Sequence, residues 1–106
     1  MKPSEYRNVF NTGIRFHEKT MLIIATKNTY GISRLGLAIA KKNVKKAVDR
    51  NRIKRVARES FRHNQSILKG IDIIVVARAN MASNNNQVLQ KILERNWVRI
   101  QSCKQF

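Results

Sequence analysis

Acidic residues are scarce in this chain, where six Asp and Glu stand against 22 Lys and Arg in 106 residues. A protein that hydrolyses its substrate with bound metal ions needs carboxylates or imidazoles gathered around those ions. The acidic residues are instead scattered over every predicted element, at Glu5, Glu18, Asp49, Glu59, Asp72 and Glu94. The two histidines, His17 and His63, also lie in different predicted elements. We therefore predict no metal site and no catalytic residue in the protein.

Cysteine is nearly absent, and long hydrophobic runs are missing. Cys103 is the single cysteine, which excludes an internal disulfide and favours a reducing compartment. The longest apolar runs, MLIIA and IIVVA, are far too short to span a bilayer. The first ten residues lack the apolar segment of a secretory signal. These absences predict a soluble protein of the cytoplasm.

Positive charge dominates the composition of the chain, with a formal net charge of +16 and a pI near 11.3. The positive charges of such a compact domain repel one another, and binding to a polyanion best relieves this repulsion. Nucleic acid is the first candidate partner and an acidic membrane surface the second. The hydrophobic fraction of 42% suffices for one modest core, so we expect a single domain over residues 1–106.

The pattern of apolar residues predicts an α+β sandwich with helices packed on a sheet. Ser4 is the expected N-cap of a first helix that Gly13 ends. The expected elements after it are strands at 14–17, 20–26 and 34–41, a helix at 45–67 closed by Gly70, a strand at 71–78 and a helix around 88–100. In the third strand one face carries only small side chains, which suits the close approach of another element or a ligand: Gly36, Ala38 and Ala40.

The helix at 45–67 has two contrasting faces on a wheel of 100° per residue. Its apolar side predicts packing on the sheet: Ile53, Val56, Ala57, Ser60 and Phe61. Its other side and flank carry basic and polar residues: Arg50, Asn51, Arg52, Lys54, Arg55, Arg58 and Arg62. Residues 41–62 hold half of the net charge, +8. Arg binds phosphate in a bidentate manner, so this face is predicted to bind a phosphate backbone.

Four lysines precede this helix, and seven aromatic residues are spread over the chain. The lysines suit contacts with backbone charge but carry no base specificity: Lys41, Lys42, Lys45 and Lys46. Phe16, Phe61 and Trp97 are assigned to the core. Glu59 is expected to pair with Arg55 or Arg62 on its own helix.

The segment AKKNVKKAVDRNRIKRVARESFR resembles the signature of the protein subunit of bacterial ribonuclease P. The hallmark of that family is an RNR helix, here Arg50-Asn51-Arg52, followed by Ile53-Lys54-Arg55 and preceded by a strand that ends in Ala40-Lys41-Lys42. The resemblance extends from the first helix through LGLAIAKK and DIIVVAR to the last helix, which is nearly the whole chain.

This resemblance implies an α-β-β-β-α-β-α two-layer sandwich with a four-stranded sheet and a left-handed βαβ crossover. It implies binding to a large catalytic RNA and to the 5′ leader of precursor tRNA. The RNA subunit would perform the Mg²⁺-dependent endonucleolytic cleavage that yields the mature tRNA 5′ end. Tyr6 and Phe10 match family positions that line a cleft for the single-stranded leader. A cleft aromatic of some members falls near Ile24, which is aliphatic here.

Two other functions fit parts of the sequence. A small ribosomal or other structural RNA-binding protein would carry the same charge without affecting tRNA 5′ processing. A protein-only nuclease is disfavoured by the scattered carboxylates, although the two histidines leave metal-free acid–base chemistry open.

Overall fold

The structure is a computed structural model that describes residues 1–103 and 105–106. It contains three helices, two short 3-10 turns and four strands, in the order α1, β1, β2, β3, α2, η1, β4, η2, α3. The bounds are α1 Pro3–Thr12, β1 Ile14–His17, β2 Met21–Lys27, β3 Arg34–Ala38, α2 Ala47–His63, η1 Gln65–Leu68, β4 Ile71–Ala77, η2 Met81–Ser83 and α3 Asn86–Gln101. The predicted α+β class and element order are confirmed.

The four strands form one sheet in the order β1-β2-β4-β3. β2 pairs antiparallel with β1 and β4, with Ile24 opposite Ile74. β3 pairs parallel with β4 and is joined to it through α2. β3 is therefore an edge strand next to the helix that carries the basic signature. The left-handed sense of this crossover stays a prediction.

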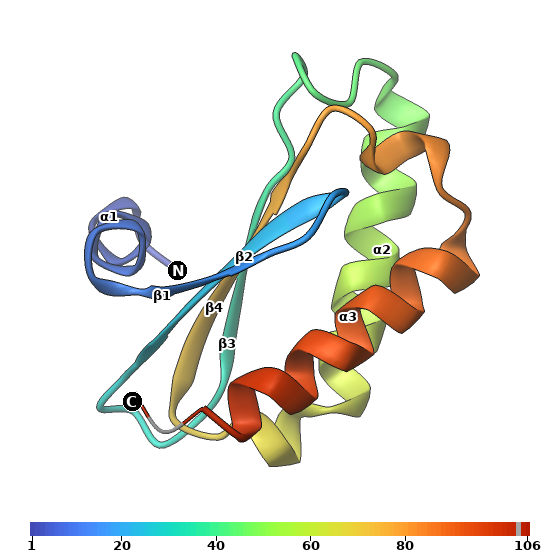
Figure 1. Ribbon diagram of the computed structural model, residues 1–106. Coiled ribbons are helices and arrows are strands. Elements are labelled where there is room, and N and C mark those ends of the chain that lie inside the picture. The colour runs from blue at the N-terminus through green and yellow to red at the C-terminus, as the bar shows by residue number, and fades with distance from the viewer. Residues whose placement is uncertain (104) are drawn as a thin grey trace.

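Helices α2 and α3 cover one face of the sheet and α1 lies on the other (Figure 1). The main core lies under α2 and α3, where the expected core aromatics Phe16, Phe61 and Trp97 are all buried. The Phe61 and Trp97 rings meet edge to face at 6.1 Å, and the Trp97 indole N–H donates to the buried Ser60 hydroxyl over 2.8 Å. These contacts hold α2 and α3 together.

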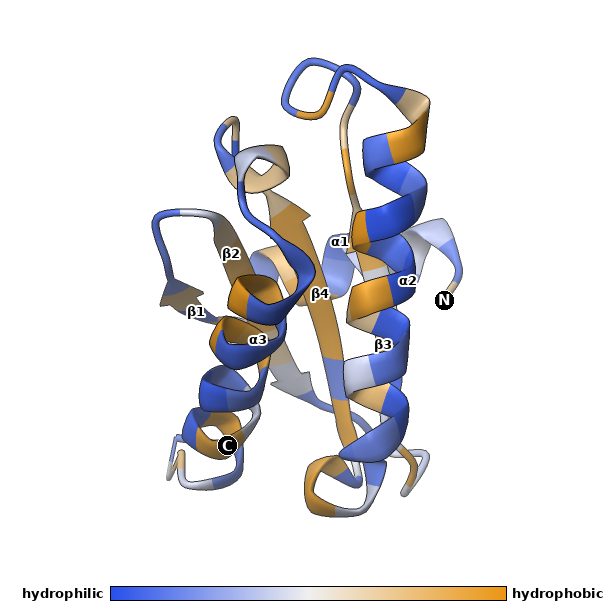
Figure 2. Ribbon diagram, turned by 90° about the vertical axis from the view of Figure 1, so that its right-hand side faces the viewer, coloured by the Kyte–Doolittle hydropathy of each residue, from blue (hydrophilic) through white to orange (hydrophobic). Residues whose placement is uncertain are grey.

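The apolar stripe of α2 is buried as the wheel predicts: Ile53, Val56, Ala57, Ser60 and Phe61. Figure 2 shows the hydrophobic segments of α2 facing inward and the hydrophilic ones facing outward. The predicted end at residue 67 was wrong, because α2 stops at His63. Asn64 donates its side-chain amide to the Ser60 carbonyl over 2.7 Å, and the chain continues as η1.

Other predicted boundaries were also wrong, and α2 begins at Ala47, two residues after the expected start. β3 ends at Ala38, three residues before the expected Lys41. The N-cap of α1 is Lys2, not Ser4. Pro3 takes the first helical position, where its missing N–H costs nothing, and Glu5 accepts a hydrogen bond from the Lys2 backbone N–H over 2.6 Å. Asn85 is the N-cap of α3, since its side chain accepts a hydrogen bond from the Val88 N–H over 2.9 Å.

Candidate nucleic-acid interface

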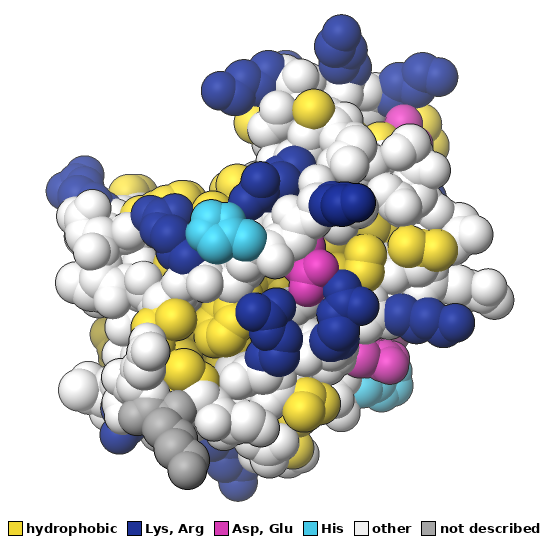
Figure 3. Space-filling model, in the orientation of Figure 1, with side chains coloured by type: hydrophobic (Ala, Val, Ile, Leu, Met, Phe, Trp, Pro, Cys, Tyr) yellow, Lys and Arg dark blue, Asp and Glu magenta, His cyan; other side chains and the backbone are white. Residues whose placement is uncertain are grey.

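The outward face of α2 presents the predicted basic and polar residues in two groups. Asn51, Arg55, Arg58 and Arg62 are exposed, whereas Arg50, Arg52 and Lys54 are half-buried. The preceding lysines are exposed on the loop between β3 and α2: Lys41, Lys42, Lys45 and Lys46. Figure 3 shows Lys and Arg side chains standing out at the end of the molecule where α2 begins. A surface with this concentration of positive charge suits a phosphate backbone.

Arg50 holds the loop before α2. Its Nη1 donates to the carbonyls of Val44 and Lys45, each over 2.9 Å. The Val44 side chain is itself buried, so this loop is fixed both by the Arg50 hydrogen bonds and by the core. Arg50 therefore shapes the lysine-bearing loop as well as contributing charge.

Arg52 ties α2 to the link before α3. Its guanidinium donates to the Ala82 carbonyl over 3.0 Å, the Asn84 carbonyl over 3.1 Å and the Asn86 Oδ1 over 2.8 Å. Sequence reasoning assigned Arg50 and Arg52 to RNA alone and missed these contacts, because helical spacing cannot show which guanidinium meets a distant carbonyl. RNA contact by both residues stays a prediction.

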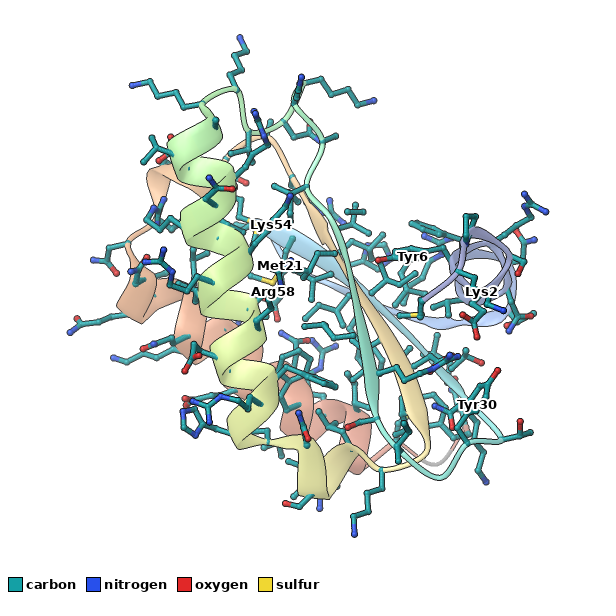
Figure 4. The ribbon with its side chains drawn as sticks, turned by 180° about the vertical axis from the view of Figure 1, so that it is seen from behind. Lys2, Tyr6, Met21, Tyr30, Lys54 and Arg58 are labelled. Carbon is teal, nitrogen blue, oxygen red and sulfur yellow. The ribbon has the colours of Figure 1, made fainter. Side chains whose placement is uncertain are left out.

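A groove lies between the edge strand β3 and α2, with a volume of about 470 Å³. Leu35, Leu37 and Phe61 supply its apolar part. Its polar and charged lining comes from both sides: Ser33, Arg34, Lys54, Arg58, Arg62, Gln65 and the Tyr6 side chain. In Figure 4, Tyr6 reaches toward β3 from α1, while Lys54 and Arg58 extend from α2 on the other side. An apolar strip beside a row of cations suits a single strand with stacked bases and charged phosphates.

The Tyr6 ring packs against Gly36, on the face of β3 that carries only small side chains. A Cβ at Gly36 would lie 2.7 Å from the Tyr6 ring, so only glycine admits this contact. The Tyr6 hydroxyl accepts a hydrogen bond from the Leu37 backbone N–H over 3.2 Å. The predicted close approach of another element to this face of β3 is confirmed, and that element is α1.

Phe10 lies elsewhere on the α1 face. It is half-buried beside the small cluster formed by Val9, Ile24 and Ile74, and it is not part of the groove that Tyr6 shares with α2. Ile24 is completely buried beneath α1, which removes it from any surface that meets RNA. The structure thus brings Tyr6, but not Phe10, to the basic helix, and contact of either ring with a leader stays a prediction.

An ionic network that the sequence did not reveal fastens α1 to the sheet. Arg34 donates through Nε and Nη2 to Asp72, over 2.7 and 2.6 Å, and through Nη1 to Glu5 over 2.6 Å. The Lys2 backbone N–H and the Arg34 guanidinium lower the pKa of Glu5 to about 2. The hydrogen bonds to Asp72 raise the pKa of Arg34 above its ordinary value. The three partners are too far apart in sequence for any local pattern to show them.

Two further carboxylates, those of Glu59 and Glu18, also pair with arginines. The expected Glu59–Arg62 pair forms over 2.8 Å, and Glu18 accepts from Arg95 and Asn96. Among residues 1–103 and 105–106, no three His, Cys, Asp or Glu side chains gather as they would around a metal ion. No helix within those residues is long and apolar enough to cross a membrane.

The fold and this charge distribution define a class of small α+β domains in which a basic helix beside an edge strand is suited to a phosphate backbone. The family model for ribonuclease P matches residues 1–101. The ribonuclease P protein component of Methylococcus capsulatus is 45% identical over 96 residues, covering 91% of this chain and 75% of the relative. That of Vibrio campbellii is 42% identical over 100 residues, covering 94% and 85%.

Solved structures agree with the sequence relatives. The ribonuclease P protein of Staphylococcus aureus superposes with a TM-score of 0.86 at 28% identity, covering 96% of this chain and 93% of that one. The chain belongs to the ribonuclease P protein family. It is thus a protein component of that ribonucleoprotein, and the resemblance seen in the RNR segment is confirmed.

Proposed function

We propose that this chain binds the catalytic RNA of ribonuclease P and the 5′ leader of precursor tRNA, and so assists removal of the leader. The groove that joins Tyr6 to the cations of α2 carries the proposal, because it places an aromatic ring, an apolar strip and phosphate-binding side chains side by side. Residues 1–106 act as one RNA-binding domain, in the cytoplasm of a bacterium.

Within this proposal the exposed basic and polar residues of α2 divide by position. Asn51 and Arg55 lie on α2 away from the groove and are suited to the catalytic RNA together with the four loop lysines. Arg58 and Arg62 line the groove and are suited to leader phosphates. Arg50 and Arg52 contribute charge and fix the surrounding loops.

Catalysis belongs to the RNA subunit in this proposal, and Mg²⁺ is bound by that RNA. Glu5 and Asp72 are engaged with Arg34, and Glu18 is engaged with Arg95 and Asn96. The chain's own contribution is to hold and orient RNA.

Reconstitution tests the proposal. The protein is mixed with a bacterial ribonuclease P RNA at low magnesium, and cleavage of precursor tRNA is followed with and without protein. We expect cleavage only with RNA present, and faster cleavage when the protein is added. A structural RNA-binding protein would leave the rate unchanged, and cleavage by protein free of RNA and of contaminating nuclease would identify a protein-only nuclease.

A further inference from the structure

Tyr30 is an aromatic side chain left in the open, with 59% of its surface exposed. It lies in the turn between β2 and β3, followed by Gly31 with a φ of 75°. No other aromatic residue in the described part of the chain is classed as exposed. Neither the RNR signature nor the predicted cleft includes it.

The ring is nonetheless held firmly. The Arg34 guanidinium lies under one face, 4.1 Å from the ring centroid. The Tyr30 hydroxyl donates to Glu5 over 3.2 Å, and its backbone N–H donates to the Asn28 Oδ1 over 2.9 Å. Arg34 is itself fixed by Asp72. One face of the ring is thus covered and its position set before any ligand arrives, which reduces the entropy lost on binding.

Tyr30 and Tyr6 both contact residues of β3. Tyr6 contacts Gly36, and Tyr30 contacts Arg34. Gly36 and Arg34 are two residues apart along β3, which places their Cα atoms about 7 Å apart. In Figure 4 both tyrosines lie on the α1 side of β3, with Tyr30 toward the β2–β3 turn.

A shallow hollow of about 320 Å³ lies beside Tyr30. Lys27 contributes a cation to it, and its two carboxylates, Glu5 and Asp72, are both paired with Arg34. Exposed aromatics bind the π-face of any base, and a nearby ammonium neutralises the phosphate. The charge of +16 makes a polyanionic ligand more favourable here than an apolar peptide.

We propose that Tyr30 is a second stacking platform for single-stranded RNA, binding a nucleobase of the leader farther from the cleavage site than the one at Tyr6. This inference rests on the proposed function. The base stacks on the ring face opposite Arg34, and Lys27 contacts the adjoining phosphate.

Leaders of graded length test the proposal. The holoenzyme is titrated with precursor tRNAs whose leaders are extended one nucleotide at a time, and Kd is measured for wild type, Tyr30→Ala, Tyr30→Phe and Ile32→Ala. Ile32 is the matched control, because it is equally exposed at 59% in the same turn but has an aliphatic side chain with no ring face for a base. We expect Tyr30→Ala to weaken binding about 5- to 150-fold, the equivalent of one lost base stack, only once the leader is long enough to reach it.

The other variants separate stacking from structure. Tyr30→Phe keeps the ring and should bind long leaders nearly as well as wild type, and Ile32→Ala should match wild type at every length. A 2-aminopurine in the leader should be quenched by wild type at one position and not by Tyr30→Ala. Equal Kd values for Tyr30→Ala and wild type at all lengths, or a loss that also affects mature tRNA, would overturn the inference. If leader length does not affect wild-type binding, the proposed function itself fails.

Discussion

Replacing Arg34 by Met is the sharpest test of how α1 is held. The Met side chain fills similar space but donates no hydrogen bond, so Asp72, whose side chain is only 5% exposed, loses two charged donors and keeps one from Asn28. Breaking a buried ion pair by removing one partner costs about 3–5 kcal/mol. Because the Arg34 side chain is 20% exposed, we expect the lower end, about 3 kcal/mol. For a domain of this size that lowers Tm by roughly 12–24 °C.

The measurement is thermal and urea unfolding of three variants beside wild type. Arg62→Met is the control, because its pair with Glu59 is exposed and should change stability by less than about 0.5 kcal/mol. Arg34→Met combined with Asp72→Asn should regain part of the loss, since the unpaired charge is gone. If Arg34→Met melts like Arg62→Met, or the second substitution lowers stability further, the buried network does not secure α1.

Three further outcomes follow from the site. Arg55→Ala and Arg58→Ala should each flatten the slope of log affinity for RNA against log salt by roughly one if each holds a phosphate, and an unchanged slope would place that residue off the interface. Tyr6→Ala with Phe10→Ala should weaken binding of leader-bearing precursor by roughly 1–3 kcal/mol per lost stack while leaving mature tRNA unaffected. A parallel melt shows whether folding is lost instead, and an unchanged preference for precursor in a folded variant would refute the cleft role. Because the pKa of Glu5 is about 2 when folded, its contribution to stability is present above pH 4.5 and is lost as pH falls toward 2. Tm measured against pH should therefore fall less steeply in Glu5→Gln than in wild type over that range, and parallel curves would contradict this.

The periodic spacing of apolar residues made part of the fold predictable from the sequence. The buried stripe of α2 follows from spacing alone, because residues three and four apart share a helix face. Boundaries were less predictable. The apolar residues Ile67 and Leu68 continue the pattern of α2 past its end at His63, although the backbone there has already changed to a 3-10 turn.

The candidate site was predictable where it depends on composition and not where it depends on distant pairs. The exposed cations of α2 were found from the wheel. The roles of Arg50 and Arg52 as loop anchors, and the joining of Arg34 to Glu5 and Asp72, depend on contacts between elements that only the folded chain brings together. The separation of Phe10 from the groove could not be predicted either, because it depends on how α1 is rotated on the sheet.

The division of the interior into two unequal parts has a consequence for motion. The cluster beneath α1 has only three fully buried residues, Val9, Ile24 and Ile74, whereas the larger core lies on the opposite face of the sheet. We therefore expect α1 to open as a small cooperative unit while α2, α3 and the sheet remain folded. Since Tyr6 and Glu5 both belong to α1, one local opening event would remove the Tyr6 ring from Gly36 and the Glu5 carboxylate from the Tyr30 hydroxyl together, while the Tyr30 ring keeps its contact with Arg34.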